Sequence, residues 1–243
     1  MSDDKPQRLR GGNTGEVVRD GDTVSRPSGE WTPAVHRLLH HLDTAGVPGV
    51  PKPMGITTYR REVLSFVTGV VPTYRMPGWV WSQTALESSA QLLRRVHDAT
   101  AGADLQGPWR SAIHEPVEVI CHNDFATYNL VFEGESVVGV IDWDFASPGP
   151  RLWDLAYLAY RIVPLSCGDR RDGFTDEERE RRLRHLIAAY GWDGEPRDVI
   201  SVLHERLVEL AAFSDDMAIG LGKPELGEHA KLYRYDAARL VAT

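Results

Sequence analysis

A histidine, an aspartate and an asparagine stand within one short run of apolar residues. The run is "VICHNDFATYNLVF", residues 119–132, and its polar members include His122, Asp124 and Asn129. A buried polar group costs roughly 1 to 3 kcal/mol unless something pairs with it. These three side chains therefore need a structural partner, a ligand or both.

The segment that follows predicts a β-hairpin that gathers oxygen atoms. Residues 129–142 read "NLVFEGESVVGVID", which is two apolar arms around the turn "EGES". With the turn centred there, Asn129 faces Val140 and Asp142 comes just beyond. Facing residues of antiparallel strands lie ~4.5 to 5.5 Å apart. The hairpin therefore brings an amide oxygen and a carboxylate to one end of the ladder.

Oxygen ligands of this kind suit a hard cation such as Mg²⁺. Asp124, five residues before Asn129, would stand beside that ion as a proton acceptor. This combination is what phosphoryl transfer to a hydroxyl requires, and the spacing H-x-D-x-x-x-x-N is that of a kinase catalytic loop. We therefore predict catalytic roles for Asp124 and His122 and magnesium binding by Asn129 and Asp142.

A resemblance to a known family is carried by "HNDFATYNLVF" and "GVIDWDFASPGPRLWDLAY". These stretches resemble the aminoglycoside phosphotransferase and choline kinase-like family, whose fold is that of the protein kinases. The match is dense over residues 119–160 and holds in outline for most of the chain. It implies that Asp124 orients or deprotonates the acceptor hydroxyl, that Asn129 and Asp142 hold Mg²⁺, and that His122 supports the loop.

The same resemblance assigns two more aspartates. Asp154, in "WDLAY", corresponds to a buried aspartate that accepts hydrogen bonds from the catalytic-loop backbone, which is a structural role. Asp144 follows "IDW" at a position that varies in the family. Its role stays open between metal binding and substrate binding.

The N-terminal part is expected to bind the nucleotide. By the same resemblance, "GGNTG" with Gly11 and Gly12 would be the loop whose backbone N–H groups cover the phosphates. The segment "LSFVTG", residues 64–69, resembles the hinge whose backbone pairs with adenine, which points to Phe66 and Val67.

Two departures from the family pattern affect this part of the chain. The third strand, "TVSRPSG", offers Arg26 where the family has a lysine for the phosphates, and the first helix, residues 31–46, lacks a clear glutamate to pair with it. Arginine is a permanent cation that binds phosphate, but its planar fork differs from an ammonium in geometry. We predict that Arg26 contacts the nucleotide.

The order of elements favours an α+β fold. Alternation and an Asp-Gly turn predict a small sheet at the start, and helices are predicted over residues 31–46 and 82–100. A strand-rich centre ends at Pro150, and almost everything after it is predicted to be helical. The prediction is a bilobal, protein kinase-like fold. Residues 1–69 would form a reduced nucleotide-binding lobe with the hinge, and residues 70–243 a helical lobe with the catalytic loop and acceptor site.

Composition narrows the partners. The chain has 35 acidic and 27 basic residues, so its formal net charge of -8 argues against non-specific binding to nucleic acid or to anionic lipid. No stretch approaches the ~18 apolar residues of a membrane span, and the N-terminus lacks a signal-peptide core, so we predict a cytoplasmic protein without membrane contact. Four acids of the C-terminal part would suit a cationic acceptor or form a solvated surface: Asp215, Asp216, Glu225 and Glu228.

Other candidate ligands have simpler explanations. Cys121 and Cys167 are too few for a disulfide framework and lack paired metal-ligand spacing, so both are predicted to be packing thiols. His36 and His40 share a helix face, but no third zinc ligand is near them in sequence. A solvated helix edge is the preferred interpretation.

These observations predict a Mg²⁺-dependent kinase that transfers the γ-phosphoryl group of ATP or GTP to a hydroxyl of a small molecule. The acceptor class includes aminoglycoside-like compounds, other cationic molecules and other metabolites. One alternative is a pseudokinase-like binding module that has lost catalysis with the lysine and glutamate pair. Another is a metal-dependent hydrolase with these ligands: His122, Asp124, Asp142 and Asp144.

Overall fold

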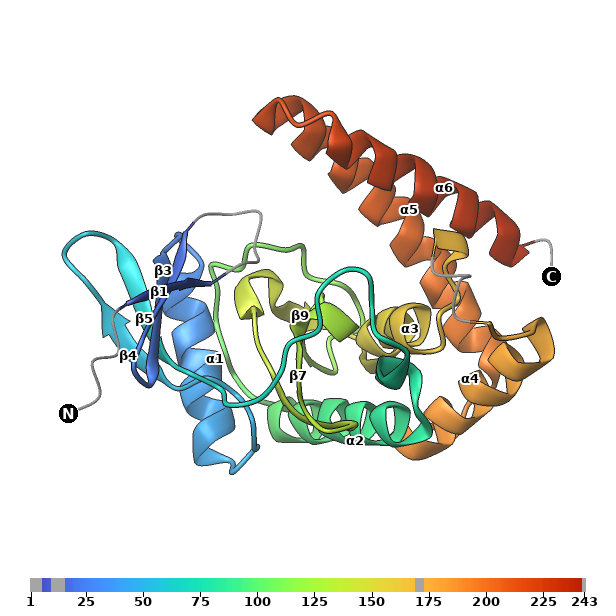
Figure 1. Ribbon diagram of the computed structural model, residues 1–243, viewed down its shortest axis with the longest axis horizontal. Coiled ribbons are helices and arrows are strands. Elements are labelled where there is room, and N and C mark those ends of the chain that lie inside the picture. Colours follow the sequence, from blue (N-terminus) through green and yellow to red (C-terminus); the bar gives the residue numbers. More distant parts are fainter. Residues whose placement is uncertain (1–5, 10–15, 169–172, 242–243) are drawn as a thin grey trace.

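The chain begins as an antiparallel sheet and continues as packed helices (Figure 1). The computed structural model describes residues 6–9, 16–168 and 173–241. The predicted α+β class, with a sheet at the N-terminal end and a mostly helical remainder, is confirmed. The predicted phosphate loop with Gly11 and Gly12 lies outside the described residues.

Five strands form the N-terminal sheet in the order β1-β2-β3-β5-β4. A tight turn joins the second and third strands, where Asp20 pairs with Thr23 and Gly21 takes a positive φ of 56°. The Asp-Gly turn is thus where the sequence predicts it. The strands are β1 (Gln7–Leu9), β2 (Val17–Asp20), β3 (Thr23–Pro27), β4 (Pro53–Ile56) and β5 (Arg61–Ser65).

Helix α1 (Thr32–Thr44) packs beside this sheet, and helix α2 (Gln83–Thr100) lies below the hairpin of residues 130–140 in the view of Figure 1. A proline in its first turn suits the start of α1. The N-terminus of α2 is capped by Ser82, whose hydroxyl oxygen accepts the Ala85 N–H at 3.1 Å. Both helices bury one apolar face in the common core.

The hairpin β7 (Leu130–Glu133) and β8 (Ser136–Val140) differs from the prediction by one residue at its open end. Near the turn, Phe132 pairs with Val137, but a bulge shifts the register so that Val140 faces Leu130. The predicted pairing of Asn129 with Val140 is therefore wrong. An extra residue in one arm cannot be seen from apolar alternation alone.

The remaining elements complete the helical part. A second pair of short strands, β6 (Val119–Cys121) and β9 (Ser147–Gly149), flanks the hairpin in sequence. The last two helices form a long antiparallel pair that reaches beyond the body of the molecule (Figure 1). The helices after β9 are α3 (Arg151–Ile162), α4 (Asp176–Tyr190), α5 (Pro196–Leu221) and α6 (Glu225–Val241).

The boundary predicted at residue 69 stays a prediction. Val70 makes two backbone hydrogen bonds of 2.8 Å with Phe132 of the hairpin, so the chain has already left the N-terminal sheet there. Among the described residues, no helix is long and apolar enough to cross a membrane.

Candidate active site

Asp154 fixes the loop that follows β6. Its carboxylate accepts the backbone N–H groups of His122 at 2.6 Å and Asn123 at 2.8 Å, and the side-chain Nε2 of His97 at 3.2 Å. Asp154 is fully buried. Burial alone would raise the pKa of this carboxyl, but the hydrogen bond and charge of His97, with the charge of Arg206, lower it. An ionised Asp154 thus holds the loop backbone in place.

His122 is a neutral support within this loop. Its Nδ1 accepts the Asp124 N–H at 3.2 Å, so Nε2 carries the proton and donates to the Ile141 carbonyl at 3.0 Å. Burial lowers the pKa of the ring below its ordinary value. Because both ring nitrogens are engaged, His122 is not available as a metal ligand, which removes one of the four ligands of the hydrolase alternative.

Asp124 is a half-buried carboxylate with two close donors. The hydroxyl of Tyr128 donates to its Oδ1 at 2.6 Å, and Nδ2 of Asn129 donates to its Oδ2 at 2.8 Å. Burial of the carboxyl, aided by the negative charge of Asp142, raises its pKa to about 7, although both donors oppose the shift. This pKa suits a group that accepts a proton near neutral pH.

Asn129 and Asp142 meet at the open end of the hairpin, as predicted, although through a different register. The backbone oxygen of Asn129 accepts the Ile141 N–H at 2.9 Å, and Asp142 follows with a left-handed φ of 65°. Nδ2 of Asn129 donates to Asp124 only, so the amide oxygen is the end that faces away from it. An amide oxygen and a part-exposed carboxylate are a donor set that fits Mg²⁺.

Arg26 of β3 reaches across the cleft and holds three carboxylates. Its Nε donates to Glu62 at 2.5 Å, one terminal nitrogen to Asp142 at 2.6 Å, and the other to Asp144 at 2.6 Å. Burial would lower the pKa of Arg26, but the three acids raise it above its ordinary value. The contact of Arg26 with the nucleotide stays a prediction.

Glu62 of β5 was missed in the sequence, where the partner of Arg26 was sought on the helix. It is 1% exposed, and its second oxygen binds Nε2 of His36 at 2.9 Å. The helix α1 therefore contributes a histidine where the family pattern has a glutamate, and the acid comes from the sheet. The signal that could have found it is the strand pairing, because Glu62 directly faces Arg26.

The predicted hinge lies beside β5. The Phe66 N–H donates to the Asp22 carbonyl at 2.7 Å, which commits that donor within the sheet. The predicted adenine contact therefore depends on the Phe66 carbonyl and on Val67.

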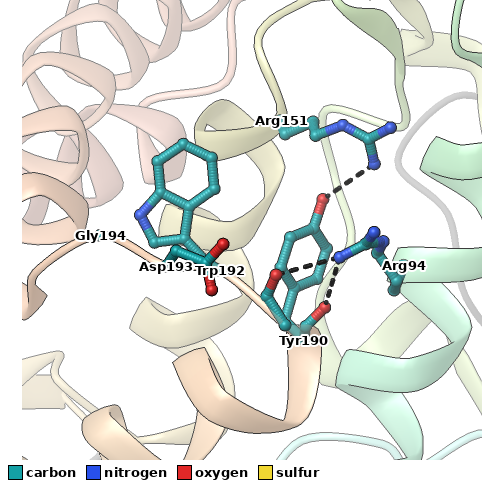
Figure 2. Close-up of a pocket in the computed structure, with 7 residues that line it drawn as sticks. Arg94, Arg151, Tyr190, Trp192, Asp193 and Gly194 are labelled. Atoms are coloured by element: carbon teal, nitrogen blue, oxygen red, sulfur yellow. Dashed lines mark hydrogen bonds between the residues drawn. The ribbon is translucent and has the colours of Figure 1, made fainter.

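A pocket of about 280 Å³ opens on the far side of the loop (Figure 2). Arg94 and Arg151 both point at Tyr190 there, and Arg94 caps the end of α4 by donating to the Tyr190 and Gly191 carbonyls at 3.2 and 3.0 Å. Both arginines also bind Asp98. Both arginines of this pocket are already paired, so we assign it to the structure of α4.

The Tyr190 hydroxyl links this pocket to the loop through His97, whose Nδ1 lies 2.7 Å from it. His97, Cys121 and Asp154 place ligand atoms within 4.8 Å of one another, as metal ligands would. However, His97 already donates to Asp154, the Cys121 thiol donates to the Pro150 carbonyl, and burial raises the pKa of that thiol. Hydrogen bonding explains the cluster without a metal.

Comparison with known proteins identifies the family. Residues 79–199 match the model of the phosphotransferase enzyme family. The trifolitoxin immunity protein of Rhizobium leguminosarum bv. trifolii is 36% identical over 194 residues, which are 75% of this chain and 73% of that protein. The chain belongs to the phosphotransferase enzyme family. The resemblance seen in the sequence is thereby confirmed.

Solved structures of other proteins have the same fold as this chain. A choline/ethanolamine kinase family protein from Mesorhizobium loti superposes with a TM-score of 0.70 at 18% identity, over 99% of this chain and 89% of that one. An aminoglycoside phosphotransferase from Streptomyces rimosus, in complex with ADP and streptomycin, gives 0.57 at 16% identity over 82% and 90% of the chains. The protein kinase-like architecture is therefore shown.

Proposed function

We propose that the chain transfers the γ-phosphoryl group of ATP to a hydroxyl of a small molecule. The observation that carries this proposal is the convergence of Asp124, Asn129 and Asp142 at one end of the hairpin, beside a basic side chain from the sheet. This is the arrangement that charge neutralisation and orientation of an attacking hydroxyl require.

Each side chain has a role in this proposal. Asp124 accepts the proton of the acceptor hydroxyl, and His122 and Asp154 keep its loop rigid. Asn129 and Asp142 would hold Mg²⁺, which when bound neutralises charge on the nucleotide phosphates. Arg26, fixed by Glu62, turns from the aspartates toward those phosphates.

ATP is the proposed donor because a solved relative binds ADP. GTP remains a testable alternative, and the contact of Phe66 and Val67 with the base is part of the proposal. A cytoplasmic location likewise stays a prediction.

The acceptor is proposed to be a small hydroxyl compound. Two of the acids considered for a cationic acceptor are engaged, since Asp215 binds Arg234 and Glu228 binds Lys231 at 2.7 Å. A fixed acidic acceptor surface is therefore less well supported than the hydroxyl chemistry. The identity to an immunity protein favours a toxin as a second class of acceptor.

The test is a screen that reads ADP and GDP release with Mg²⁺ and a panel of acceptors: streptomycin, ethanolamine, choline and trifolitoxin. We expect release with ATP and at least one acceptor above the hydrolysis background. Thermal shift with nucleotide is measured in parallel, because a ligand that binds only the folded state raises the Tm. No shift with any nucleotide would overturn the proposal, and a shift without any transfer would favour the pseudokinase-like module.

The rate of transfer is expected to depend on pH through Asp124. Because its pKa is raised to about 7 and the base must be ionised, kcat/KM should rise as the pH passes through that value. Tyr128→Phe removes a donor that favours the charged form, so the rise should move to higher pH. A kcat/KM profile from about pH 5.5 to about pH 9 tests both statements. The control is Tyr59→Phe, at a phenol that is 87% exposed.

Arg26→Ala is expected to increase the affinity for Mg²⁺ alone while weakening ATP binding. Loss of the guanidinium leaves Asp142 without the cation that binds it and removes one of the two arginines beside Asp144, so a divalent ion should bind about tenfold more tightly. Calorimetric titration with Mg²⁺ and then with ATP measures both effects. Arg61→Ala, at an arginine on β5 that binds Ser25, is the matched control. Equal Mg²⁺ affinity in the wild type and Arg26→Ala would contradict this expectation.

A further inference from the structure

Arg110 is a second arginine at the cleft, and neither motif nor family resemblance points to it. It lies in the irregular segment between α2 and β6. Its guanidinium carbon lies over two rings, 4.5 Å from the centroid of Trp31 and 4.4 Å from that of Phe145. These two cation–π contacts hold the guanidinium in place.

One nitrogen of Arg110 is held out of water without a hydrogen bond to any described residue. Nη1 of Arg110 is buried and, within the described part of the chain, makes no hydrogen bond. The nearest acid oxygen is Oδ2 of Asp144 at 3.6 Å, which is too long for a hydrogen bond. A buried guanidinium N–H that is left unpaired is unfavourable, so the position is suited to an anionic oxygen from a ligand.

The surroundings place this N–H at the catalytic end of the cleft. Arg26 binds one oxygen of Asp144 from the sheet side, and Arg110 approaches the other oxygen. The carbonyl of Phe145, whose ring contacts Arg110, accepts Nδ2 of Asn123 at 2.8 Å. Asn123 is the immediate neighbour of Asp124 in the chain, so a ring contact and a hydrogen bond link Arg110 to the loop that carries the proposed base.

We propose that Arg110 binds a non-bridging oxygen of the γ-phosphoryl group, while Arg26 serves the phosphates nearer the sheet. This inference rests on the proposed function. In the transfer, the acceptor oxygen bonds to the γ-phosphorus, the bond from that phosphorus to the β–γ bridging oxygen breaks, ADP leaves, and the hydroxyl proton passes to Asp124. The positive charge of Arg110 compensates the negative charge of the γ-phosphoryl group during the transfer. The guanidinium is already in position before the substrate binds.

Direct binding tests the inference without turnover. The affinities of a non-hydrolysable ATP analogue and of ADP, each with Mg²⁺, are measured by calorimetry for the wild type, Arg110→Met and Arg110→Lys. We expect Arg110→Met to bind the triphosphate about tenfold more weakly and ADP within about twofold, because only the triphosphate carries the γ group. Arg110→Lys keeps the charge without the planar edge and should lie between them.

The control is Arg37→Met, at an exposed arginine that donates to the Gln106 and Gly107 carbonyls of the same segment. It should change neither affinity. If the wild type binds neither nucleotide, the proposed function fails. If the wild type binds both nucleotides but the Arg110 variants weaken both equally, or bind both as tightly as the wild type does, the inference about the γ-phosphoryl group is overturned. Should Arg110→Met unfold, as judged by its Tm, Arg110→Lys decides between these outcomes.

Discussion

Asp124→Asn is expected to lower kcat by about 10³-fold while nucleotide affinity stays within a few-fold, because a positioned general base contributes 10² to 10⁴. The amide keeps the shape of the side chain but cannot take up the acceptor proton. It also has to meet the Tyr128 hydroxyl and the Asn129 amide, which both donate to the present carboxylate. The substitution does not remove the phosphate contact proposed for Arg26 or the Mg²⁺ contact proposed for Asp142.

Single-turnover transfer and calorimetric nucleotide binding should be measured together for this variant. Asp104→Asn, at an exposed aspartate in the segment after α2, is the matched control and should keep kcat within about twofold. A kcat for Asp124→Asn within about tenfold of the wild type would refute the assignment of Asp124 as the proton acceptor.

Asp154→Ala is expected to cause the largest loss of stability, about 3 to 5 kcal/mol in the free energy of unfolding. Two backbone N–H groups of the loop and the His97 ring would lose their common acceptor in a fully buried place. The loop that carries Asp124 would lose its support at the same time, so activity should fall with stability.

The stability lost in Asp154→Ala is expected to depend on pH, because the pKa of Asp154 is shifted in the folded state. The pKa of Asp154 is lowered in the folded state, so its stabilising effect is complete above the unfolded value of about 3.9 and is lost as the pH falls through the folded pKa. Urea unfolding should therefore show a constant difference between wild type and Asp154→Ala near neutral pH and a shrinking one below about pH 4. Asp154→Asn, which keeps the volume, should lose less. A difference that persists unchanged into acid would show that the carboxylate charge has no part in stability.

The catalytic loop and the hairpin were predictable because their signals are local. His122, Asp124 and Asn129 follow one another at a fixed spacing, and apolar alternation fixes the approximate register that delivers Asp142. The bulge was not predictable, since one residue inserted in β8 leaves the alternation of apolar side chains along that strand almost unchanged.

The other cleft residues depend on pairings between distant segments. Glu62 meets Arg26 only because β5 pairs with β3, and its neighbours in sequence look like an ordinary half-exposed strand. Arg110 stands in a segment without periodicity, and its position is set by the rings of Trp31 and Phe145. No sequence pattern carries that information.

The left-handed backbone at Asn123 and Asp142 restricts which substitutions these two positions can accept during evolution. Both are non-glycine residues with φ near +65°, and an ordinary side chain in that conformation costs roughly 1 to 2 kcal/mol, whereas asparagine, aspartate and glycine tolerate it. At Asp142, asparagine is therefore the conservative replacement, because alanine would add backbone strain to the lost charge. A homologue that had lost phosphoryl transfer would still need asparagine, aspartate or glycine at these two positions, because its backbone conformation would be the same. These residues would therefore be retained after the activity was lost.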